Sequence, residues 1–327
     1  MNNYPLLIIV FISSLLLTVF LEYRLIPILS KRAHQPIYTE GPTWHMKKQG
    51  TPTMGGLAFV IAIFLTLLFC SLIFTYRRND AMAGASILIT ALFTVGNSLI
   101  GLFDDMMKLL RKKNAGLSPM QKIFLQTILA LLFLMARKYY FNDATSVTLS
   151  FGKLELGLFY YPFALILILG IINCANLTDG VDGLASSVAT AIGVVFIVMC
   201  KNDSAHISIV ATALVGGALG FLLFNCNPAK IFMGDTGSLF LGALAVCLAF
   251  SVNNPIIIIF IGAVYVIEGI SVILQVVYFK LTGKRLFKMA PLHHHLEKCG
   301  ISENKICVAM VILTLFFSSF VPLIFGW

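Results

Sequence analysis

The chain has 327 residues, of which 59% are hydrophobic and only 11% are charged, and its formal net charge is +9 at pH 7. Soluble domains carry roughly 25% charged residues, so this composition excludes an ordinary soluble protein and indicates a polytopic membrane protein. The basic residues fall in short segments between apolar stretches, a pattern that orients membrane helices and does not point to nucleic acid.

Ten apolar segments are long enough to cross a bilayer, which takes about 20 helical residues. We expect an all-α integral membrane protein with about ten transmembrane helices, forming a single polytopic domain over residues 1–327. The predicted spans are 5–29, 53–75, 82–102, 119–137, 158–175, 184–200, 205–224, 236–252, 255–280 and 304–325. The division between the eighth and ninth spans rests on Asn253, Asn254 and Pro255, which are residue types that turn a chain.

Basic residues are concentrated in the loops on one side of this arrangement. These loops are 30–52, 103–118, 176–183, 225–235 and 281–303. Because basic loops remain in the cytosol, we expect both termini to be external. Prolines 36, 42 and 52 exclude a continuous helix across 33–52, whereas Pro291 and Gly300 suit the start and the end of a short helix within 281–303.

Five aspartates and three consecutive histidines lie at the ends of apolar segments, all on the predicted cytosolic side. They are Asp104, Asp105, Asp179, Asp182, Asp235, His293, His294 and His295. Carboxylates are costly near an apolar bilayer, so their concentration at one border needs a functional reason. The simplest reason is a site for Mg²⁺ and phosphate at the membrane surface.

The first pair, Asp104 and Asp105, ends the third span together with Lys108. On a helix Asp104 and Lys108 share a face, while Asp105 points about 100° away. The two carboxylates can hold Mg²⁺ or accept a proton, and the lysine can neutralise phosphate. The alternative is a solvated helix end with one weak salt bridge.

Two further segments carry acidic residues beside glycines. NLTDGVDGLA contains Asp179 and Asp182, preceded by Asn173 and Asn176; capping of a helix is the alternative explanation for its carboxylates. FMGDTGS contains Asp235, which suits Mg²⁺ because that ion prefers one or two carboxylates with substrate phosphate. Further candidates for ligand contacts are Asn225, Phe232 and Gly234 near Asp235, and Lys48 and Thr53 in the separate segment KKQGTPTMGG.

The three histidines cannot all point at one ion, because successive helical side chains turn by about 100°. We therefore expect one or two to face the site and disfavour a zinc centre. An interfacial helix attracted to anionic lipid is compatible with this segment as well. Glu268, in the middle of the ninth span, has either a hydrogen-bonded structural role or a place in a substrate groove.

Taken together, these motifs resemble the phospho-N-acetylmuramoyl-pentapeptide transferase family, within the polyprenyl-phosphate N-acetylhexosamine-1-phosphate transferase superfamily. The matching stretches are GTPTMGG (50–56), LFDDMMK (102–108), NLTDGVDGLA (176–185), NPAKIFMGDTGSLFLG (227–242) and APLHHHLEKCG (290–300). The resemblance implies transfer of phospho-MurNAc-pentapeptide from UDP-MurNAc-pentapeptide to undecaprenyl phosphate, giving lipid I and UMP. It also implies a bacterial plasma membrane, a cytosolic active site, Mg²⁺ as cofactor and a possible homodimer.

The resemblance assigns Asp104, Asp105, Asp235 and His294 as catalytic residues, with Asp235 as the Mg²⁺ ligand. With the patterns above, the expected substrate-binding residues are Lys48, Thr53, Lys108, Lys122, Asn173, Asn176, Asp179, Asp182, Asn225, Phe232, Gly234, His293 and His295. Lys108 and Lys122 are the expected phosphate-neutralising lysines. We expect direct attack by the lipid phosphate, with any residual proton taken by Asp105 rather than Asp104; a covalent aspartyl-phosphate intermediate is the rival mechanism.

Two other functions are compatible with parts of the sequence. A sister enzyme would transfer GlcNAc-1-phosphate to a polyprenyl phosphate, but APLHHHLE and TPTMGG argue against it. A cation- or proton-coupled transporter would use buried acids as an ion path. Carboxylates at one membrane border rather than near the midplane argue against a transporter.

Overall fold

A computed structural model describes residues 4–31, 48, 50–111, 116–200 and 205–326. The long elements, in chain order, are α1 (Tyr4–Leu29), α2 (Gly56–Leu72), α3 (Ala81–Arg111), α4 (Pro119–Phe141), α5 (Tyr160–Thr178), α6 (Leu184–Met199), α7 (Ala205–Asn225), α8 (Gly234–Ser251), α10 (Ala263–Thr282) and α12 (Glu303–Ser318). The short elements are η2 (Ile73–Arg77), β1 (Ser146–Leu149), β2 (Gly152–Glu155), η3 (Gly157–Phe159), η4 (Pro255–Ile257), α9 (Ile258–Ile261), α11 (Leu292–Lys298) and α13 (Val321–Phe325).

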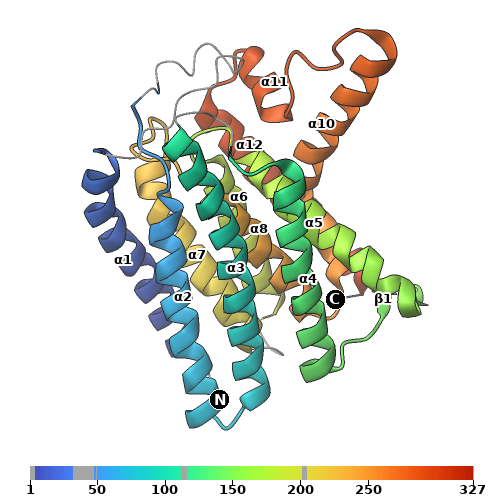
Figure 1. The fold of residues 1–327 in the computed structure, drawn as a ribbon. Coiled ribbons are helices and arrows are strands. Elements are labelled where there is room, and N and C mark those ends of the chain that lie inside the picture. Colours follow the sequence, from blue (N-terminus) through green and yellow to red (C-terminus); the bar gives the residue numbers. More distant parts are fainter. Residues whose placement is uncertain (1–3, 32–47, 49, 112–115, 201–204, 327) are drawn as a thin grey trace.

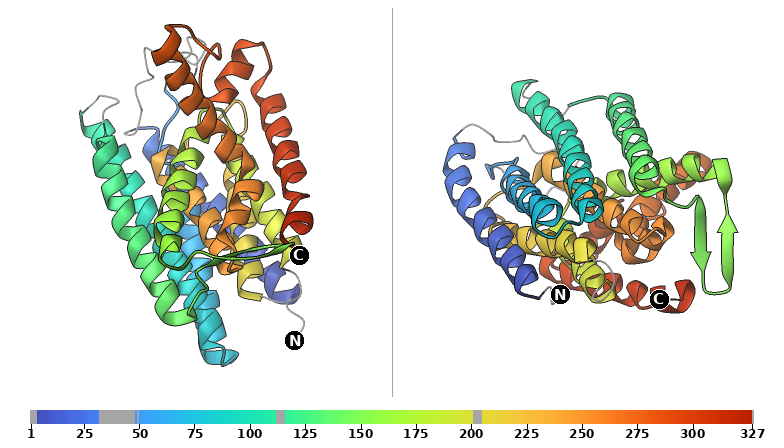
Figure 2. Two further views of the ribbon diagram at one scale, coloured as in Figure 1. Left: turned by 90° about the vertical axis from the view of Figure 1, so that its right-hand side faces the viewer. Right: turned by 90° about the horizontal axis from the view of Figure 1, so that it is seen from below.

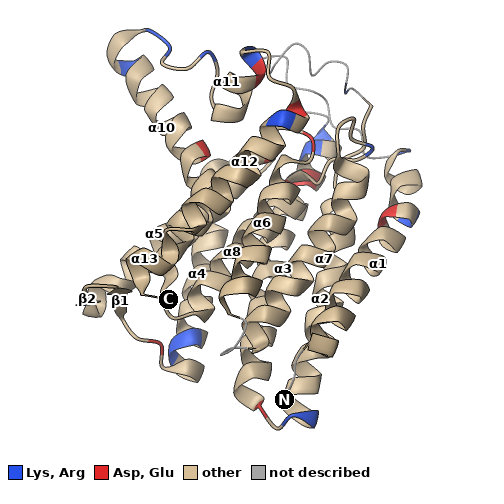
Figure 3. Ribbon diagram, turned by 180° about the vertical axis from the view of Figure 1, so that it is seen from behind, with Lys and Arg blue, Asp and Glu red and all other residues tan. Residues whose placement is uncertain are grey.

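The all-α membrane fold is confirmed. Within the described ranges, nine helices are long and apolar enough to cross a membrane. The predicted span 184–200 forms α6, an apolar helix of 16 residues that is shorter than each of these nine candidate spans. The predicted span 255–280 is interrupted, because α9 ends at Ile261 and α10 begins at Ala263. Figure 3 shows that charged residues gather toward the two ends of the bundle.

Helix α8 lies in the interior of the bundle, and its residues from Thr236 to Phe250 are buried. It packs against α2, α3 and α5, while α1 packs against α2 and α7 on one flank. Small residues along α8, such as Gly242 and Ala243, allow this close packing, which is how membrane helices associate without a hydrophobic driving force. The first turn of α8 is therefore held from several sides.

Two parts of the chain extend beyond the bundle. The upper part of helix α10 leans away from the bundle in Figure 1, and the chain then returns to α11. At the opposite end, β1 and β2 pair as an antiparallel hairpin that projects sideways in Figure 2. This hairpin was not predicted from the sequence, because its strands lie in the polar connection between the fourth and fifth spans.

The predicted short helix within 281–303 is confirmed as α11, which follows Pro291 and ends before Gly300. Gly300 has a φ of 86°, a conformation that favours glycine. The other long predicted loop, 33–52, lies outside the described residues except for Lys48 and residues 50–52.

Candidate active site

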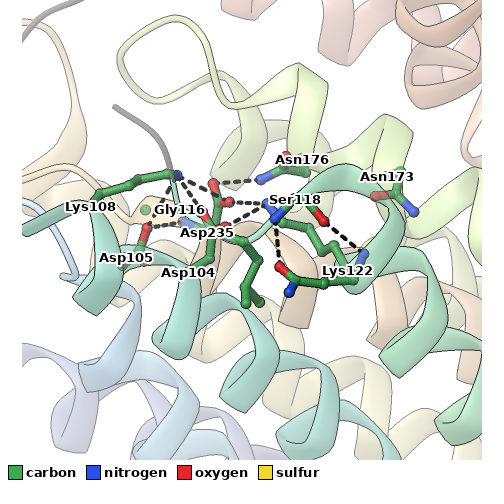
Figure 4. Close-up of polar contacts among 12 residues, drawn as sticks. Asp104, Asp105, Lys108, Gly116, Ser118, Lys122, Asn173, Asn176 and Asp235 are labelled. Atoms are coloured by element: carbon green, nitrogen blue, oxygen red, sulfur yellow. Dashed lines mark hydrogen bonds and ion pairs between the residues drawn. The ribbon is translucent and has the colours of Figure 1, made fainter. Parts of the chain in front are cut away.

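Three aspartates from distant parts of the chain meet at one end of the bundle. Asp104 and Asp105 lie near the end of α3, and Asp235 lies in the first turn of α8. One carboxylate oxygen from each falls within 4.8 Å of the others. Figure 4 shows their side chains converging between α3, α4 and α8.

Two lysines lie among these carboxylates. Lys108 Nζ is 2.6 Å from Asp104 Oδ2 and 3.2 Å from Asp235 Oδ2. Lys122 Nζ is 2.6 Å from Asp235 Oδ2 and 3.3 Å from Asp104 Oδ1. The predicted shared face of Asp104 and Lys108 is thus confirmed, and Lys122 joins them from α4.

Local sequence explains how Lys122 reaches this position. Ser118 caps α4, because its side chain accepts a hydrogen bond from the backbone N–H of Gln121 while the Gln121 side chain accepts one from the backbone N–H of Ser118. Pro119 at the first helical position suits this start. The capping box fixes the first turn of α4, so that Lys122 projects toward Asp235.

Asn176 completes the surroundings of Asp235. Its Nδ2 donates to Asp235 Oδ1 at 3.0 Å and to Ser238 Oγ at 2.7 Å. Both oxygens of Asp235 are therefore engaged, one by the amide of Asn176 and the other by the two lysine ammonium groups. A carboxylate held in this way is ionised and fixed in direction.

The cluster opens into a cavity of about 910 Å³. Its lining includes twelve of the predicted site residues, namely Lys48, Thr53, Asp104, Lys108, Lys122, Asn176, Asp179, Asp182, Asn225, Phe232, Gly234 and Asp235. Asp105, Asn173 and the three histidines are not among the described residues that line it. Asn173 instead donates to Gln126 Oε1 and to the carbonyl oxygen of Leu169.

A second polar group borders the same cavity. Lys48 Nζ lies 2.7 Å from both Asp182 Oδ1 and Glu303 Oε2. Burial opposes the charge of Lys48, but these two carboxylates outweigh that effect and raise the pKa of its ammonium group. Asp182 also accepts hydrogen bonds from Asn227 Nδ2 and the backbone N–H of Ala229.

Asp179 lines the same cavity. It follows the last residue of α5, and Asp182 lies in the turn that leads to α6, so the two do not share a helix. Burial, followed by the nearby carboxylates of Asp235, Asp105 and Asp182, raises the pKa of Asp179 well above its usual value. A cation or a hydrogen-bond donor on a ligand would relieve this repulsion.

The histidines have three different environments, as expected for successive side chains of a helix. His293 is fully buried, its Nδ1 lies 3.2 Å from Glu268 Oε2, and its backbone N–H donates to Glu268 Oε1. His294 Nδ1 lies 2.6 Å from Glu297 Oε2. His295 Nδ1 accepts a hydrogen bond from the backbone N–H of Lys288. Glu268 therefore has a hydrogen-bonded role that ties α10 to α11.

His293 also contacts the turn that carries Asp179 and Asp182. A Cβ at Gly180 would clash with the ring of His293. We expect Gly180→Ala to destabilise the protein by about 1–3 kcal/mol, as overpacking of buried sites does. Thermal unfolding in detergent measures this effect. Gly170→Ala is the matched control, because a Cβ there meets no atom within 4 Å; equal stability of the two variants would contradict the prediction.

Comparison with known proteins assigns the family. Residues 87–253 match Glycosyl transferase family 4, and residues 48–60 match the phospho-N-acetylmuramoyl-pentapeptide-transferase signature 1. Proteins named phospho-N-acetylmuramoyl-pentapeptide-transferase align along most of the chain. One from Clostridium botulinum is 45% identical over 296 residues, covering 89% of this chain and 87% of its own length. The chain belongs to the phospho-N-acetylmuramoyl-pentapeptide-transferase family.

Other members of the family support the same assignment. A Clostridium perfringens member is 42% identical over 320 residues and covers 96% of each chain. A Bacillus thuringiensis member is 43% identical over 298 residues and covers 90% of each chain. The protein is accordingly a transferase and a multi-pass membrane protein.

The donor set of the aspartate cluster fits the Mg²⁺ that we expect for this family. Its ligands are carboxylate oxygens, which Mg²⁺ prefers to nitrogen or sulfur. Asp104 and Asp235 both line the cavity, so that metal, water and phosphate oxygen have access to them. Two lysine ammonium groups already balance part of the negative charge.

Glu303 contacts the predicted site but was not among the predicted site residues. It begins α12. Its Oε2 also accepts hydrogen bonds from Lys48 Nζ and from the backbone N–H of Asp182. No local pattern could indicate this contact, because it depends on how α12 packs against the turn between α5 and α6.

Proposed function

We propose that the protein transfers phospho-MurNAc-pentapeptide from UDP-MurNAc-pentapeptide to undecaprenyl phosphate, giving lipid I and UMP in a Mg²⁺-dependent reaction. This is the first membrane step of peptidoglycan synthesis. The family assignment supports the reaction. The observation that carries it is the meeting of Asp104, Asp235 and two lysines in a cavity of about 910 Å³ at one end of the bundle.

The chemistry requires two anionic phosphates to approach each other. A carrier phosphate oxygen forms a bond to the sugar-linked phosphorus, and the bond from that phosphorus to the UMP oxygen breaks. Positioning and charge neutralisation are the main catalytic tasks in such transfers. Lys108 and Lys122 supply positive charge at fixed positions, where it does not have to reorganise during the reaction.

Asp235 is our proposed Mg²⁺ ligand, with Asp104 beside it. When bound, Mg²⁺ would neutralise phosphate oxygens and orient the leaving group. The carrier phosphate has a second pKa of about 6 and is largely dianionic at neutral pH, so a strong base is not required. Direct attack remains our proposal. The sequence favoured Asp105 as the acceptor of a residual proton, but we now propose Asp104 for this role, because Asp104 lines the cavity and Asp105 is absent from its described lining.

The nucleotide fits best at the side of the cavity lined by Lys48, Asp182, Asn225 and Phe232. Lys48 offers a charge to phosphate, and the carboxylate and amide groups offer hydrogen bonds to uracil or ribose. Phe232 offers a ring on which a base can stack. Asn225 is already fixed, because its side chain bonds the backbone of Gly183 and Ile231.

The same proposal places this cavity at the cytosolic face of the bacterial plasma membrane, with both termini external. The basic loops at the cavity end support that orientation. We further propose a single polytopic domain that functions as a monomer or homodimer. His294, which lies on α11 and is absent from the described cavity lining, stays a proposed catalytic residue on the family resemblance alone.

UMP release from purified protein in detergent tests the proposal. Undecaprenyl phosphate and Mg²⁺ are supplied with either UDP-MurNAc-pentapeptide or UDP-GlcNAc. We expect release only with the first substrate. Release with UDP-GlcNAc would assign the sister reaction, and release with neither substrate from folded protein would reject the proposed transfer.

The contacts of Glu303 give a specific prediction for the nucleotide side. Glu303→Gln removes the charge partner of Lys48 and weakens the support of Asp182. We expect the KM for the nucleotide substrate to rise about tenfold, the size of a lost hydrogen bond to a charged group, with a smaller change in kcat. Glu155→Gln, at an exposed ion pair on the hairpin, is the control. An unchanged KM in Glu303→Gln would reject the assigned role.

A further inference from the structure

Three residues on one face of α3 hold the first turn of α8. Ser98 Oγ donates to the carbonyl oxygen of Thr236 at 2.9 Å. One turn further along α3, Gly101 makes room for the backbone, since a Cβ there would clash with the carbonyl oxygen of Asp235. Asp105 follows one turn later. The spacing of these three residues places them in a row along the helix.

Asp105 accepts three hydrogen bonds from this turn. The backbone N–H of Asp235 donates to Oδ1 at 3.1 Å, and the backbone N–H of Thr236 donates to Oδ2 at 2.9 Å. The Thr236 hydroxyl donates to the same Oδ2 at 2.7 Å. Asp105 thus satisfies N–H groups that a helix start leaves without partners inside the helix.

The two neighbouring aspartates consequently face different surroundings. Both side chains are buried, but Asp104 lines the cavity and contacts both lysines. Asp105 is absent from the described cavity lining, lies 3.7 Å from Lys108 Nζ, and accepts its hydrogen bonds from the start of α8. Thr236 is 0% exposed and, like Asp105, is absent from the described cavity lining. The hydrogen bonds between Asp105 and Thr236 therefore lie behind the residues that line the cavity.

We propose that Thr236 and Asp105 are positioning residues that aim the Asp235 carboxylate into the cavity. Their hydrogen bonds set the direction of the first turn of α8. Asp235 belongs to that turn, and its own backbone N–H donates to Asp105. A misplacement of about 1 Å in a catalytic group can cost 100-fold in rate. The proposal rests on the proposed function for the role of Asp235 as a metal ligand.

The test compares Thr236→Val, which removes the hydroxyl at nearly constant volume, with Thr236→Ser, which keeps it. Mn²⁺, as a spectroscopic substitute for Mg²⁺, is titrated into purified protein without substrates and followed by electron paramagnetic resonance. Turnover is measured separately. Thr314→Val is the matched control, since Thr314 is fully buried and its hydroxyl bonds only a carbonyl of its own helix.

We expect Thr236→Val to raise the Mn²⁺ dissociation constant and to lower kcat, each about tenfold or more, as loss of a hydrogen bond to a charged group implies. The KM for the nucleotide substrate should not change. Thr236→Ser and Thr314→Val should resemble the wild type. An unchanged Mn²⁺ affinity in Thr236→Val would overturn the proposal.

Asp105→Asn provides a second test that does not depend on Thr236→Val being recovered in folded form. One oxygen of Asp105 is replaced by an NH₂ group, which cannot accept the hydrogen bonds that Asp235 and Thr236 donate. We therefore expect the same loss of Mn²⁺ affinity as in Thr236→Val. A direct proton acceptor would instead lose turnover with intact Mn²⁺ affinity, and that outcome would overturn the proposal. Because the titration contains no substrate, it remains informative if UMP release fails.

Discussion

Asp235→Asn should abolish UMP release, lowering turnover by at least about 100-fold, as expected when a preorganised charged group in an active site is lost. In the structure Asp235 Oδ2 lies between the ammonium groups of Lys108 and Lys122, and Oδ1 accepts from Asn176. The substitution keeps the size of the side chain but removes its charge. It removes one of the two carboxylates that Lys108 and Lys122 share, the other being Asp104, and it removes the proposed Mg²⁺ ligand.

The folded state should survive this substitution, because the backbone of Asp235 keeps its contact with Asp105. Size-exclusion profiles and circular dichroism check the fold, and UMP release at several Mg²⁺ concentrations measures the loss. Asp80→Asn is the control. Asp80 lies at the end of α3 opposite to Asp104 and accepts a hydrogen bond from the backbone N–H of Ala83, and asparagine caps a helix equally well. Turnover within a few-fold of wild type would reject Asp235 as the metal ligand.

Lys108→Gln is expected to have the second largest effect. Lys108 Nζ lies within 4 Å of carboxylate oxygens from all three aspartates, at 2.6 Å, 3.7 Å and 3.2 Å from Asp104, Asp105 and Asp235. Removing the charge leaves buried carboxylates to repel one another, and breaking such a pair typically costs about 3–5 kcal/mol. Turnover should fall by about 100- to 1,000-fold, because a charge aimed at the reacting phosphates is lost.

The stability of this variant offers a check that is independent of catalysis. In metal-free buffer its Tm should fall, and added Mg²⁺ should raise its Tm by more than it raises that of the wild type. The reason is that a divalent cation can replace the missing charge among the carboxylates. Lys153→Gln, in an exposed ion pair of the hairpin, should change neither property. An equal response to Mg²⁺ in Lys108→Gln and wild type would contradict this explanation.

Much of the fold followed from hydropathy alone, because an apolar segment of sufficient length has few alternatives to a membrane helix. The interruption at Gly262 was not predicted, since Ile258–Ile261 and the start of α10 are both apolar and differ only in backbone direction. The hairpin of β1 and β2 was not predicted either, for a different reason. Its strands have four residues each, too few for a periodic pattern.

The sequence predicted many of the residues that line the candidate site, but not which way each side chain points. Asp104 and Asp105 are adjacent in sequence, yet one faces the cavity and the other faces the start of α8. Helical geometry predicted their divergence by about 100°, but not which of them meets the cavity. That choice depends on where α8 packs, which no local pattern in LFDDMMK records.

Helix α6 has a consequence for the membrane around the protein. Its 16 residues span about 24 Å, whereas the hydrocarbon core of a bilayer is about 30 Å thick. The two ends of α6 cannot both reach the borders of an undistorted bilayer, so one of them lies below the border, where irregular backbone is accommodated if it is buried in protein or lines a cavity. The end next to Asp182 borders the cavity and its charges. A cavity recessed at this end would bring the aspartates to the level of the headgroups, and a lipid phosphate would reach the site without leaving its own leaflet.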